Sequence, residues 1–202
     1  MTLANRITVS RMALSLVIFC LIIFKTPWTA VAALVLLTIA SISDYFDGAI
    51  ARRTMTTTPF GAIADPFADK ILVMSVFLAF ASLRELAVPL WAVFLILLRE
   101  LTISTLRVLA AMHGEVMKAE RTGKIKTTIQ MISAFTIMVL LVLLLWDKKV
   151  TLHPYLHYAS TLAKPVTWWL TTITAGFTLV SGVVYLYNHR VLIDKSWSER
   201  GR

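Results

Sequence analysis

The chain has 202 residues, of which 58% are hydrophobic and only 15% are charged. Because a soluble domain carries about 45–50% apolar and about 25% charged residues, this composition excludes an ordinary soluble protein and predicts a polytopic membrane protein. The net charge of +9 reflects 20 Lys and Arg against 11 Asp and Glu. In a membrane protein, such an excess indicates cytoplasmic loops and contact with anionic membrane lipids, so we expect no nucleic-acid partner.

Six apolar segments follow one another along the chain, each close to the ~20 residues that a helix needs to cross the hydrocarbon core. We therefore predict an all-α integral membrane protein with six transmembrane helices, forming a single domain over residues 1–202. Residues 1–9 are expected to form a short interfacial segment. The predicted spans are Thr8–Phe24, Trp28–Ser43, Ala62–Ser82, Val88–Ala111, Thr127–Trp146 and Val166–Tyr187.

Local signals refine the ends of these segments. Thr26-Pro27, Val88-Pro89 and Lys164-Pro165 predict helix starts, because proline is tolerated in the first turn of a helix. We expect the second helix to continue past the membrane to Arg52 or Arg53. A short polar stretch, residues 54–59, is then expected to make a tight connection to the third helix.

Basic residues gather at one set of helix ends, and this asymmetry predicts the orientation. The positive-inside rule places both termini in the cytoplasm, together with the ends at which the second and third helices meet. A bacterial inner membrane is the expected location. The crowded set is Arg6, Arg11, Arg52, Arg53, Lys118, Arg121, Lys124, Lys126, Arg190, Lys195, Arg200 and Arg202, whereas the sparse set is Lys25, Arg84, Lys148, Lys149 and Lys164.

Four aspartates form one spaced array beside the second and third apolar segments. The array reads Asp44-x2-Asp47-Gly48-x2-Ala51-Arg52-x8-Gly61-x3-Asp65-x3-Asp69. At about 100° per residue, its first half falls in one helical stripe and its second half in another, so two facing helices would bring the four carboxylates together. Carboxylates beside a bilayer core are costly and rarely lack a task. Hard oxygen ligands in this number suit Mg²⁺ or Mn²⁺, so the array predicts a metal site.

The array also predicts a class of chemistry. Two metal ions about 3.5–4 Å apart would clamp a diphosphate and stabilise both the attacking and the leaving oxygen. One carboxylate can be spared as a general base toward an alcohol, and Arg52 can contact a phosphate oxygen. Carboxylates that merely cap helix ends would not come as two aligned pairs beside membrane spans. We therefore expect displacement at a phosphoryl group, with an alcohol acceptor and a lipid partner.

The array matches the signature of the CDP-alcohol phosphatidyltransferase family without a gap or a substitution. This resemblance implies a six-helix, membrane-embedded homodimer that binds two Mg²⁺ or Mn²⁺ ions. It also implies that Asp69, as a metal ligand or a neighbour of the metals, acts as the catalytic base. The other implied metal ligands are Asp44, Asp47 and Asp65. The residues implied to line the CDP moiety are Gly48, Ala51, Arg52 and Gly61.

Three further stretches resemble the family members whose acceptor is sn-glycerol 3-phosphate. They are Asn5-x2-Thr8-x2-Arg11, Arg99-Glu100-x3-Ser104-x2-Arg107 and Gly123-Lys124-x-Lys126-Thr127-x2-Gln130. The implied reaction converts CDP-diacylglycerol and sn-glycerol 3-phosphate into phosphatidylglycerophosphate and CMP. Because the acceptor brings a phosphate dianion, the site needs cations beyond the metals. The candidates for holding that phosphate are Arg107, Arg121, Lys124, Lys126 and Arg190.

Several alternatives stay open from the sequence. The acceptor of a sibling enzyme would be phosphatidylglycerol, giving cardiolipin, or inositol phosphate or serine, and inositol phosphate would demand much the same cations. A different class, an ion or proton transporter, predicts acids spread along the depth of the spans, whereas here they cluster at one end of two helices. An inactive relative that serves as a scaffold is disfavoured because all four aspartates are retained.

Other polar residues have simpler interpretations. Glu100 and Arg107 share one stripe of the fourth segment, within reach of a structural ion pair, and an intramembrane charge is expected to matter for folding or function. Lys70 is expected to balance the charge of Asp69. His153 and His157 have a metal-like spacing, but a solvated loop with no acid nearby is the expected setting.

Overall fold

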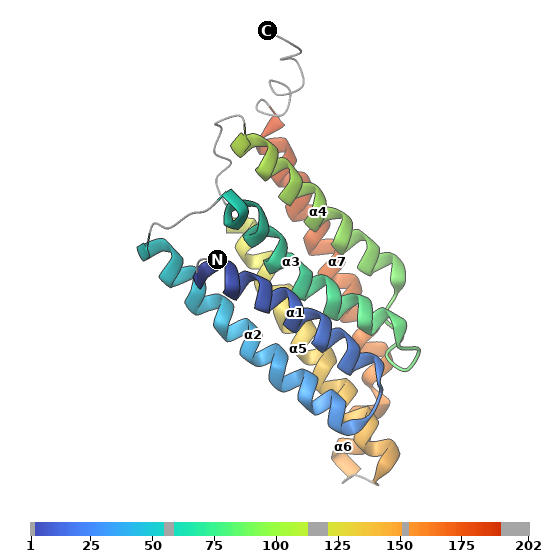
Figure 1. Cartoon of the computed structure of the whole chain (residues 1–202). Coiled ribbons are helices and arrows are strands. Elements are labelled where there is room, and N and C mark those ends of the chain that lie inside the picture. Colours follow the sequence, from blue (N-terminus) through green and yellow to red (C-terminus); the bar gives the residue numbers. More distant parts are fainter. Residues whose placement is uncertain (1–2, 55–58, 113–120, 151–153, 191–202) are drawn as a thin grey trace.

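Figure 1 shows the computed structural model, which describes residues 3–54, 59–112, 121–150 and 154–190 and contains no strand within them. Side chains are described for residues 9–43, 70–111, 123–150, 154 and 156–190. The helices are α1 Leu3–Ile23, α2 Pro27–Thr54, α3 Pro59–Ser82, α4 Leu90–Met112, α5 Arg121–Lys149, α6 Pro154–Thr161 and α7 Ala163–Asn188.

The all-α prediction is confirmed, and each of the six predicted segments corresponds to one long helix. α2 continues through Arg52 and Arg53, as expected, and so carries the first half of the aspartate array. The expected connection between α2 and α3 falls on residues 55–58, which lie outside the described part of the chain.

The short helix α6 was not predicted. Residues expected to form a solvated loop instead make a helix from Pro154 to Thr161, and an acid lies close by. His157 Nδ1 lies 2.8 Å from Asp147 Oδ2, and the Ser160 hydroxyl donates to the same oxygen at 2.8 Å. These contacts fasten α6 to the end of α5, and the prediction of a loop without a nearby acid is wrong.

The predicted helix starts have a clear local cause at α2. The Thr29 amide donates to Thr26 Oγ1 at 3.2 Å, and the Thr26 amide donates back to Thr29 Oγ1 at 3.2 Å. This reciprocal arrangement satisfies two amides that have no partner within the helix, and Pro27 follows at the first helical position. Thr26-Pro27 therefore starts α2 as the sequence predicts.

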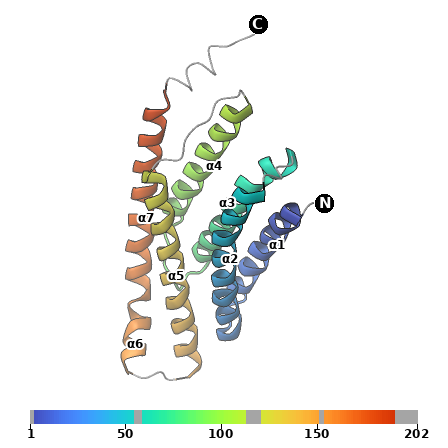
Figure 2. The ribbon, with the colours of Figure 1, turned by 90° about the vertical axis from the view of Figure 1, so that its left-hand side faces the viewer.

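The helices run along one another in a bundle (Figures 1 and 2). α1 packs against α2 and α3, α4 packs against α7, and α5 packs against both α2 and α7. The carboxyl ends of α2, α4 and α7 and the amino ends of α3 and α5 point to the same end of the bundle. The aspartate array and the basic start of α5 therefore belong to one end, which we call the site end.

Large apolar side chains cover the outside of this bundle as well as its core. The core includes Ile18, Leu37, Phe77, Phe80, Ile96 and Met138, all at most 1% exposed. Outward-facing side chains include Leu16, Trp91, Phe94, Ile132, Phe177 and Val183. An apolar exterior of this extent marks a surface that faces something other than water.

By length and composition, the structure describes two helices able to cross a membrane, over Gly123–Lys149 in α5 and Ala163–Asn188 in α7. Together with the apolar exterior, they indicate an integral membrane protein. The number of spans and the side on which the termini lie stay predictions.

A row of polar side chains on α7 lies inside the bundle, and we call it the polar seam. The buried hydroxyl-bearing positions recur every three or four residues, at Thr167, Thr171, Thr174, Thr178, Ser181 and Tyr185. Small hydroxyl-bearing residues let membrane helices approach closely and bond across the interface. Ser133 on α5 and Thr174 share a hydrogen bond of 2.6 Å, and Arg99 on α4 donates to Ser181 at 3.1 Å. This seam joins α4 and α5 to α7 and leads toward the site end.

At the opposite end, Glu85 lies between α3 and α4 and contacts two lysines from other parts of the chain. Its carboxylate lies 3.5 Å from Lys25, which follows α1, and 3.8 Å from Lys148 on α5. A hydrogen bond from its own backbone amide, and then the two ammonium groups, hold the pKa of Glu85 below its usual range against the opposing effect of burial. A carboxyl with a depressed pKa stabilises the fold above its unfolded pKa and loses that contribution as the pH falls.

We expect Glu85→Gln to lower the free energy of unfolding in detergent at pH 7 by less than about 1 kcal/mol, and the thermal midpoint with it, because both lysines are partly exposed. The difference from wild type should shrink as the pH falls below 4.5, the ordinary glutamate value. Thermal unfolding of both proteins across this pH range measures it. A difference that stays constant with pH would contradict the electrostatic account.

Candidate functional site

The aspartate array lies on two helices at the site end. Asp44 and Asp47 lie in α2, whereas Asp65 and Asp69 lie in α3, so the helical backbone expected for each pair is present. The side chains of the whole array, with Gly48, Ala51, Arg52 and Gly61, lie outside the described side chains. Their roles as metal ligands, base and CDP contacts therefore stay predictions.

The chemistry of the array fits a hard divalent cation. Of the four commonest ligand types, His, Cys, Asp and Glu, residues 44–69 contain only aspartates. Oxygen-only donor sets suit Mg²⁺ and Mn²⁺ rather than softer metals. Among the side chains that the structure describes, no cluster of three or more His, Cys, Asp and Glu offers another metal site.

A cationic cavity begins one residue beyond the array. Its volume is about 350 Å³, and its walls come from α3, α4, α5 and α7. Lys70, which follows Asp69 directly in α3, forms part of the wall. The basic residues that line it are Lys70, Arg99, Arg107, Lys124 and Lys126. Five positive side chains around one small cavity create a strong attraction for an anion.

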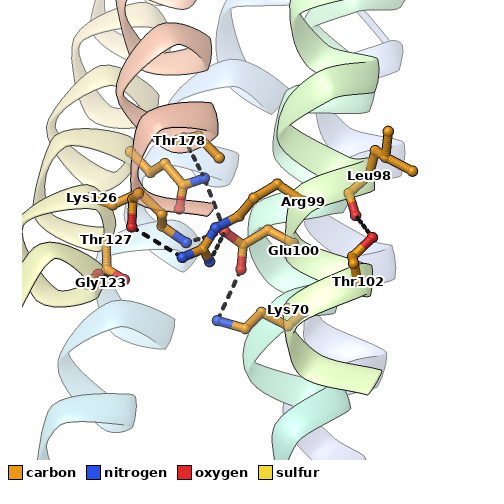
Figure 3. A network of polar contacts seen from close by, with 11 residues as sticks. Lys70, Leu98, Arg99, Glu100, Thr102, Gly123, Lys126, Thr127 and Thr178 are labelled. Atoms are coloured by element: carbon orange, nitrogen blue, oxygen red, sulfur yellow. Dashed lines mark hydrogen bonds and ion pairs between the residues drawn. The ribbon is translucent and has the colours of Figure 1, made fainter. Parts of the chain in front are cut away.

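Glu100 lies at the centre of the contacts behind this cavity (Figure 3). Its side chain is 1% exposed. Oε1 accepts a hydrogen bond from Lys126 Nζ and another, of 3.3 Å, from Gln130 Nε2, and it lies 3.4 Å from Arg99 Nη1. Oε2 faces Lys70 Nζ at 3.1 Å, an ion pair without hydrogen-bond alignment. A single carboxylate thus contacts cations from α3, α4 and α5.

Two buried donors in the cavity wall have no hydrogen-bond partner among the described residues. They are Nε of Arg99, whose side chain is 9% exposed, and the hydroxyl of Tyr185, a residue that is 3% exposed. The Arg107 guanidinium lies 5.7 Å from the centre of the Tyr185 ring. Buried donors without partners are unusual in a folded protein and often mark a site completed by a ligand. Here both donors belong to residues that line a cavity suited to a small oxyanion.

The structure brings together three of the five residues predicted to hold an acceptor phosphate. Arg107, Lys124 and Lys126 line the cavity. Arg190 is not part of the described lining, and its guanidinium lies over the Tyr187 ring, 4.5 Å from the centre. Arg121 begins α5, but its side chain lies outside the described set.

The structural ion pair that the shared stripe allows between Glu100 and Arg107 is not formed among the described contacts. Although the two residues share a helical stripe, Lys126 and Lys70 approach the Glu100 carboxylate from neighbouring helices, while Arg107 turns to the Tyr185 ring. Lys70, expected only to balance Asp69, reaches across to Glu100.

The sequence interpretation did not assign Lys70, Arg99 or Tyr185 to acceptor binding, yet all three line the cavity. Arg99 carried a usable signal, because an arginine inside an apolar segment is costly and rarely idle. Tyr185 carried a weaker one, as the last member of the polar seam that recurs every three or four residues in α7. Lys70 had no such signal, because its partner lies 30 residues away in the sequence.

The comparisons with known proteins assign the family. The sequence profile of the CDP-alcohol phosphatidyltransferases matches residues 1–180. The chain belongs to the CDP-alcohol phosphatidyltransferase family, which confirms the resemblance of the aspartate array.

Similar curated proteins share this membership. A CDP-diacylglycerol–glycerol-3-phosphate 3-phosphatidyltransferase of Bacillus subtilis is 34% identical over 148 residues, which cover 67% of this chain and 76% of the relative. A protein of the same name in Escherichia coli is 37% identical over 123 residues, covering 58% and 67%. A CMP-forming cardiolipin synthase of rice is 34% identical over 153 residues, covering 68% and 45%.

The position of Arg99 depends on a close approach to α7. A Cβ added at Gly182 would lie 2.9 Å from Arg99 Cγ, too near the arginine backbone to be relieved by moving the guanidinium alone. We expect Gly182→Ala to displace Arg99 and to weaken anion binding by roughly tenfold, the worth of one charged hydrogen bond. Protection against thermal unfolding by inorganic phosphate measures this effect.

Gly176→Ala is the matched control, because a Cβ at Gly176 on the same helix would meet no atom within 4 Å. Both changes raise helix propensity by a similar amount. Equal phosphate protection in the two variants would contradict the assigned role of Arg99 in the cavity.

Proposed function

We propose that the protein transfers the phosphatidyl group of CDP-diacylglycerol to sn-glycerol 3-phosphate, giving phosphatidylglycerophosphate and CMP in phospholipid biosynthesis. The observation that carries this proposal is the cavity with five basic residues that starts directly after Asp69. An acceptor with a phosphate monoester needs such a cavity beside the reacting groups, whereas serine does not. The names of the relatives from Bacillus subtilis and Escherichia coli support the same acceptor.

The proposal divides the site between two substrates. The carboxylates and small residues of α2 and α3 bind the CDP part of the lipid, with Gly48, Ala51 and Gly61 allowing close approach and Arg52 contacting phosphate. The cavity binds the phosphate of the acceptor. Its proposed ligands are Lys70, Arg99, Arg107, Lys124 and Lys126, with Arg121 and Arg190 as further candidates.

Asp44, Asp47, Asp65 and Asp69 are the residues that would hold two divalent cations. When bound, Mg²⁺ or Mn²⁺ supplies positive charge to the diphosphate and to the CMP that leaves. The chain's own residues would position the acceptor and accept its proton.

With the acceptor phosphate held in the cavity, the glycerol hydroxyl is directed toward Asp69, which accepts its proton as general base. The freed oxygen forms a bond to the phosphorus that carries diacylglycerol. The bond from that phosphorus to the CMP oxygen breaks, and CMP leaves with the electron pair. The cations of the cavity fix the acceptor at its phosphate and so reduce the entropy cost of bringing the two substrates together.

We also propose that the chain forms six spans with both termini and the site end in the cytoplasm, in a bacterial inner membrane, as a homodimer. The crowded set of basic residues includes Arg52, Lys124 and Arg190, which belong to helix ends at the site end, and the sparse set includes Lys25 and Arg84 at the opposite end. A cytosolic acceptor would reach the cavity directly in this orientation, and the lipid would enter from the inner leaflet.

A second candidate acceptor is phosphatidylglycerol, because the rice relative is named a cardiolipin synthase. That lipid offers a phosphodiester with a single negative charge, whereas the cavity presents five cations to its contents. The charge of a phosphate monoester matches this cavity better, so glycerol 3-phosphate is favoured. A transporter is disfavoured by the membership in a phosphatidyltransferase family.

The acceptor test measures CMP release by purified protein in detergent with CDP-diacylglycerol and Mg²⁺. Glycerol 3-phosphate, inositol phosphate, serine and phosphatidylglycerol are supplied separately, and Asp69→Asn provides the blank. We expect turnover with glycerol 3-phosphate alone, reduced at least a hundredfold in Asp69→Asn because the base is lost. Turnover with another acceptor only would overturn the proposed substrate, and full activity in Asp69→Asn would overturn the proposed base.

Lys124 tests the cavity itself. We expect Lys124→Met to raise the KM for glycerol 3-phosphate by about 10- to 100-fold, the worth of one charged contact, with little change in the KM for CDP-diacylglycerol. Lys148→Met removes the same charge at the opposite end of α5 and serves as the control. A rise in the KM for CDP-diacylglycerol without one for the acceptor would move Lys124 to the other substrate.

A further inference from the structure

We propose that Glu100 is a positioning residue for acceptor binding: its buried carboxylate fixes the ammonium groups of Lys70 and Lys126 in the cavity wall. This inference rests on the proposed function, because it assigns the cavity to the acceptor phosphate. Glu100 itself does not line the cavity and is not expected to touch a substrate.

The Glu100 carboxylate contacts the two lysines through different oxygens. Lys126 approaches Oε1 from α5, whereas Lys70 approaches Oε2 from α3 at 3.1 Å. The two oxygens of a carboxylate have a fixed separation, so the two ammonium groups are held apart at separate places. Lysine side chains are otherwise flexible and lose rotamer entropy when they are held in one position. Fixing them before the ligand arrives reduces the cost of binding.

Gln130 in turn holds the Glu100 carboxylate in place. Gln130 Nε2 lies 3.3 Å from Glu100 Oε1 and 3.5 Å from Thr178 Oγ1, linking the carboxylate to the polar seam of α7. Arg99, on the same helix, donates to Ser181 in that seam at 3.1 Å. The carboxylate, Arg99 and the two lysines therefore take their places from contacts among four helices, as Figure 3 shows for the labelled side chains.

Electrostatics alone predicts the opposite effect, which makes the role testable. A negative charge behind a phosphate-binding cavity repels the phosphate and competes for its cations, so its removal should tighten phosphate binding. If Glu100 positions the lysines, its removal leaves Lys70, Lys126 and Arg99 close together without their counter-ion. They then repel one another and move apart, because buried like charges without a partner are costly. Phosphate binding becomes weaker even though the cavity has gained net positive charge.

The test compares Glu100→Gln, which keeps the shape and removes the charge, with Glu100→Asp, which keeps the charge and withdraws it by one methylene. We expect both variants to raise the KM for glycerol 3-phosphate at least tenfold and to alter the KM for CDP-diacylglycerol less than twofold. The concentration of inorganic phosphate needed for half-maximal thermal protection should rise by a similar factor. A lower KM or tighter phosphate protection in Glu100→Gln would overturn the proposal and leave Glu100 as an electrostatic competitor.

Glu85→Gln is the matched control, since Glu85 also faces two lysines, Lys25 and Lys148, but at the opposite end of the bundle. We expect this variant to keep the wild-type KM for both substrates. If Glu85→Gln raised the KM for the acceptor as much as Glu100→Gln does, the effect would be one of general stability, and the positioning role would be overturned.

A double variant keeps the test decisive if Glu100→Gln folds poorly. Lys126→Met with Glu100→Gln removes both members of the closest pair and so leaves fewer buried charges without a partner. Because Glu100 acts through Lys70 as well as Lys126, the double variant should have a KM for glycerol 3-phosphate above that of Lys126→Met alone but well below the product of the two single effects. Multiplied effects of the two changes would contradict the proposal.

The proposed function and this inference can fail separately. Wild-type protein that turns over only a different acceptor overturns the proposed substrate, and phosphate protection then still reports on the cavity. Wild-type protein that uses glycerol 3-phosphate, with an unchanged KM in both Glu100 variants, overturns only the role of Glu100.

Discussion

The polar interior of this bundle depends on one buried carboxylate. Glu100 gives Lys70, Lys126 and Arg99 a common counter-ion at a place where water contributes little. Cations in such surroundings need a charged partner, and a carboxylate there needs cations in turn. One acid thus serves three of the five basic side chains that line the cavity next to the aspartate-bearing helices α2 and α3. The surplus of positive charge is what a phosphate monoester can neutralise.

Around Glu100, the other helices separate apolar side chains from polar ones. Large apolar side chains face outward, whereas the threonines and serines of α7 face inward and bond to α4 and α5. Several of these hydroxyls also return a hydrogen bond to the carbonyl one helical turn earlier, as Thr171 does to Thr167 at 2.7 Å. The buried threonine and serine hydroxyls of this seam thus have partners within the protein, and α7 can approach its neighbours closely. That approach places Arg99 against Gly182 and Tyr185 beside the cavity.

Length and hydropathy predicted the long helices, because long apolar segments favour helices, and Thr26-Pro27 carries its own capping pattern. The spacing of the aspartates predicts a site at the ends of α2 and α3, and the structure shows the two helices that carry them. Partners across helices were not predictable in the same way. Glu100 and Arg107 are neighbours on one helix, yet cations from α3 and α5 take the carboxylate. The eight residues of α6 are too few for an apolar pattern, and Asp147 holds them only once the chain has turned back.

We propose that the acceptor's phosphate binds in the cavity whose lysines contact Glu100, next to divalent cations on α2 and α3. An experimental structure of the protein with Mn²⁺ and sn-glycerol 3-phosphate tests this most directly. It should show the phosphate in contact with Lys126, Lys70 and Arg99 while both lysines still contact Glu100, and an anomalous manganese signal among the four aspartates. A phosphate bound away from these cations, or lysines that leave Glu100 to reach it, would contradict the account.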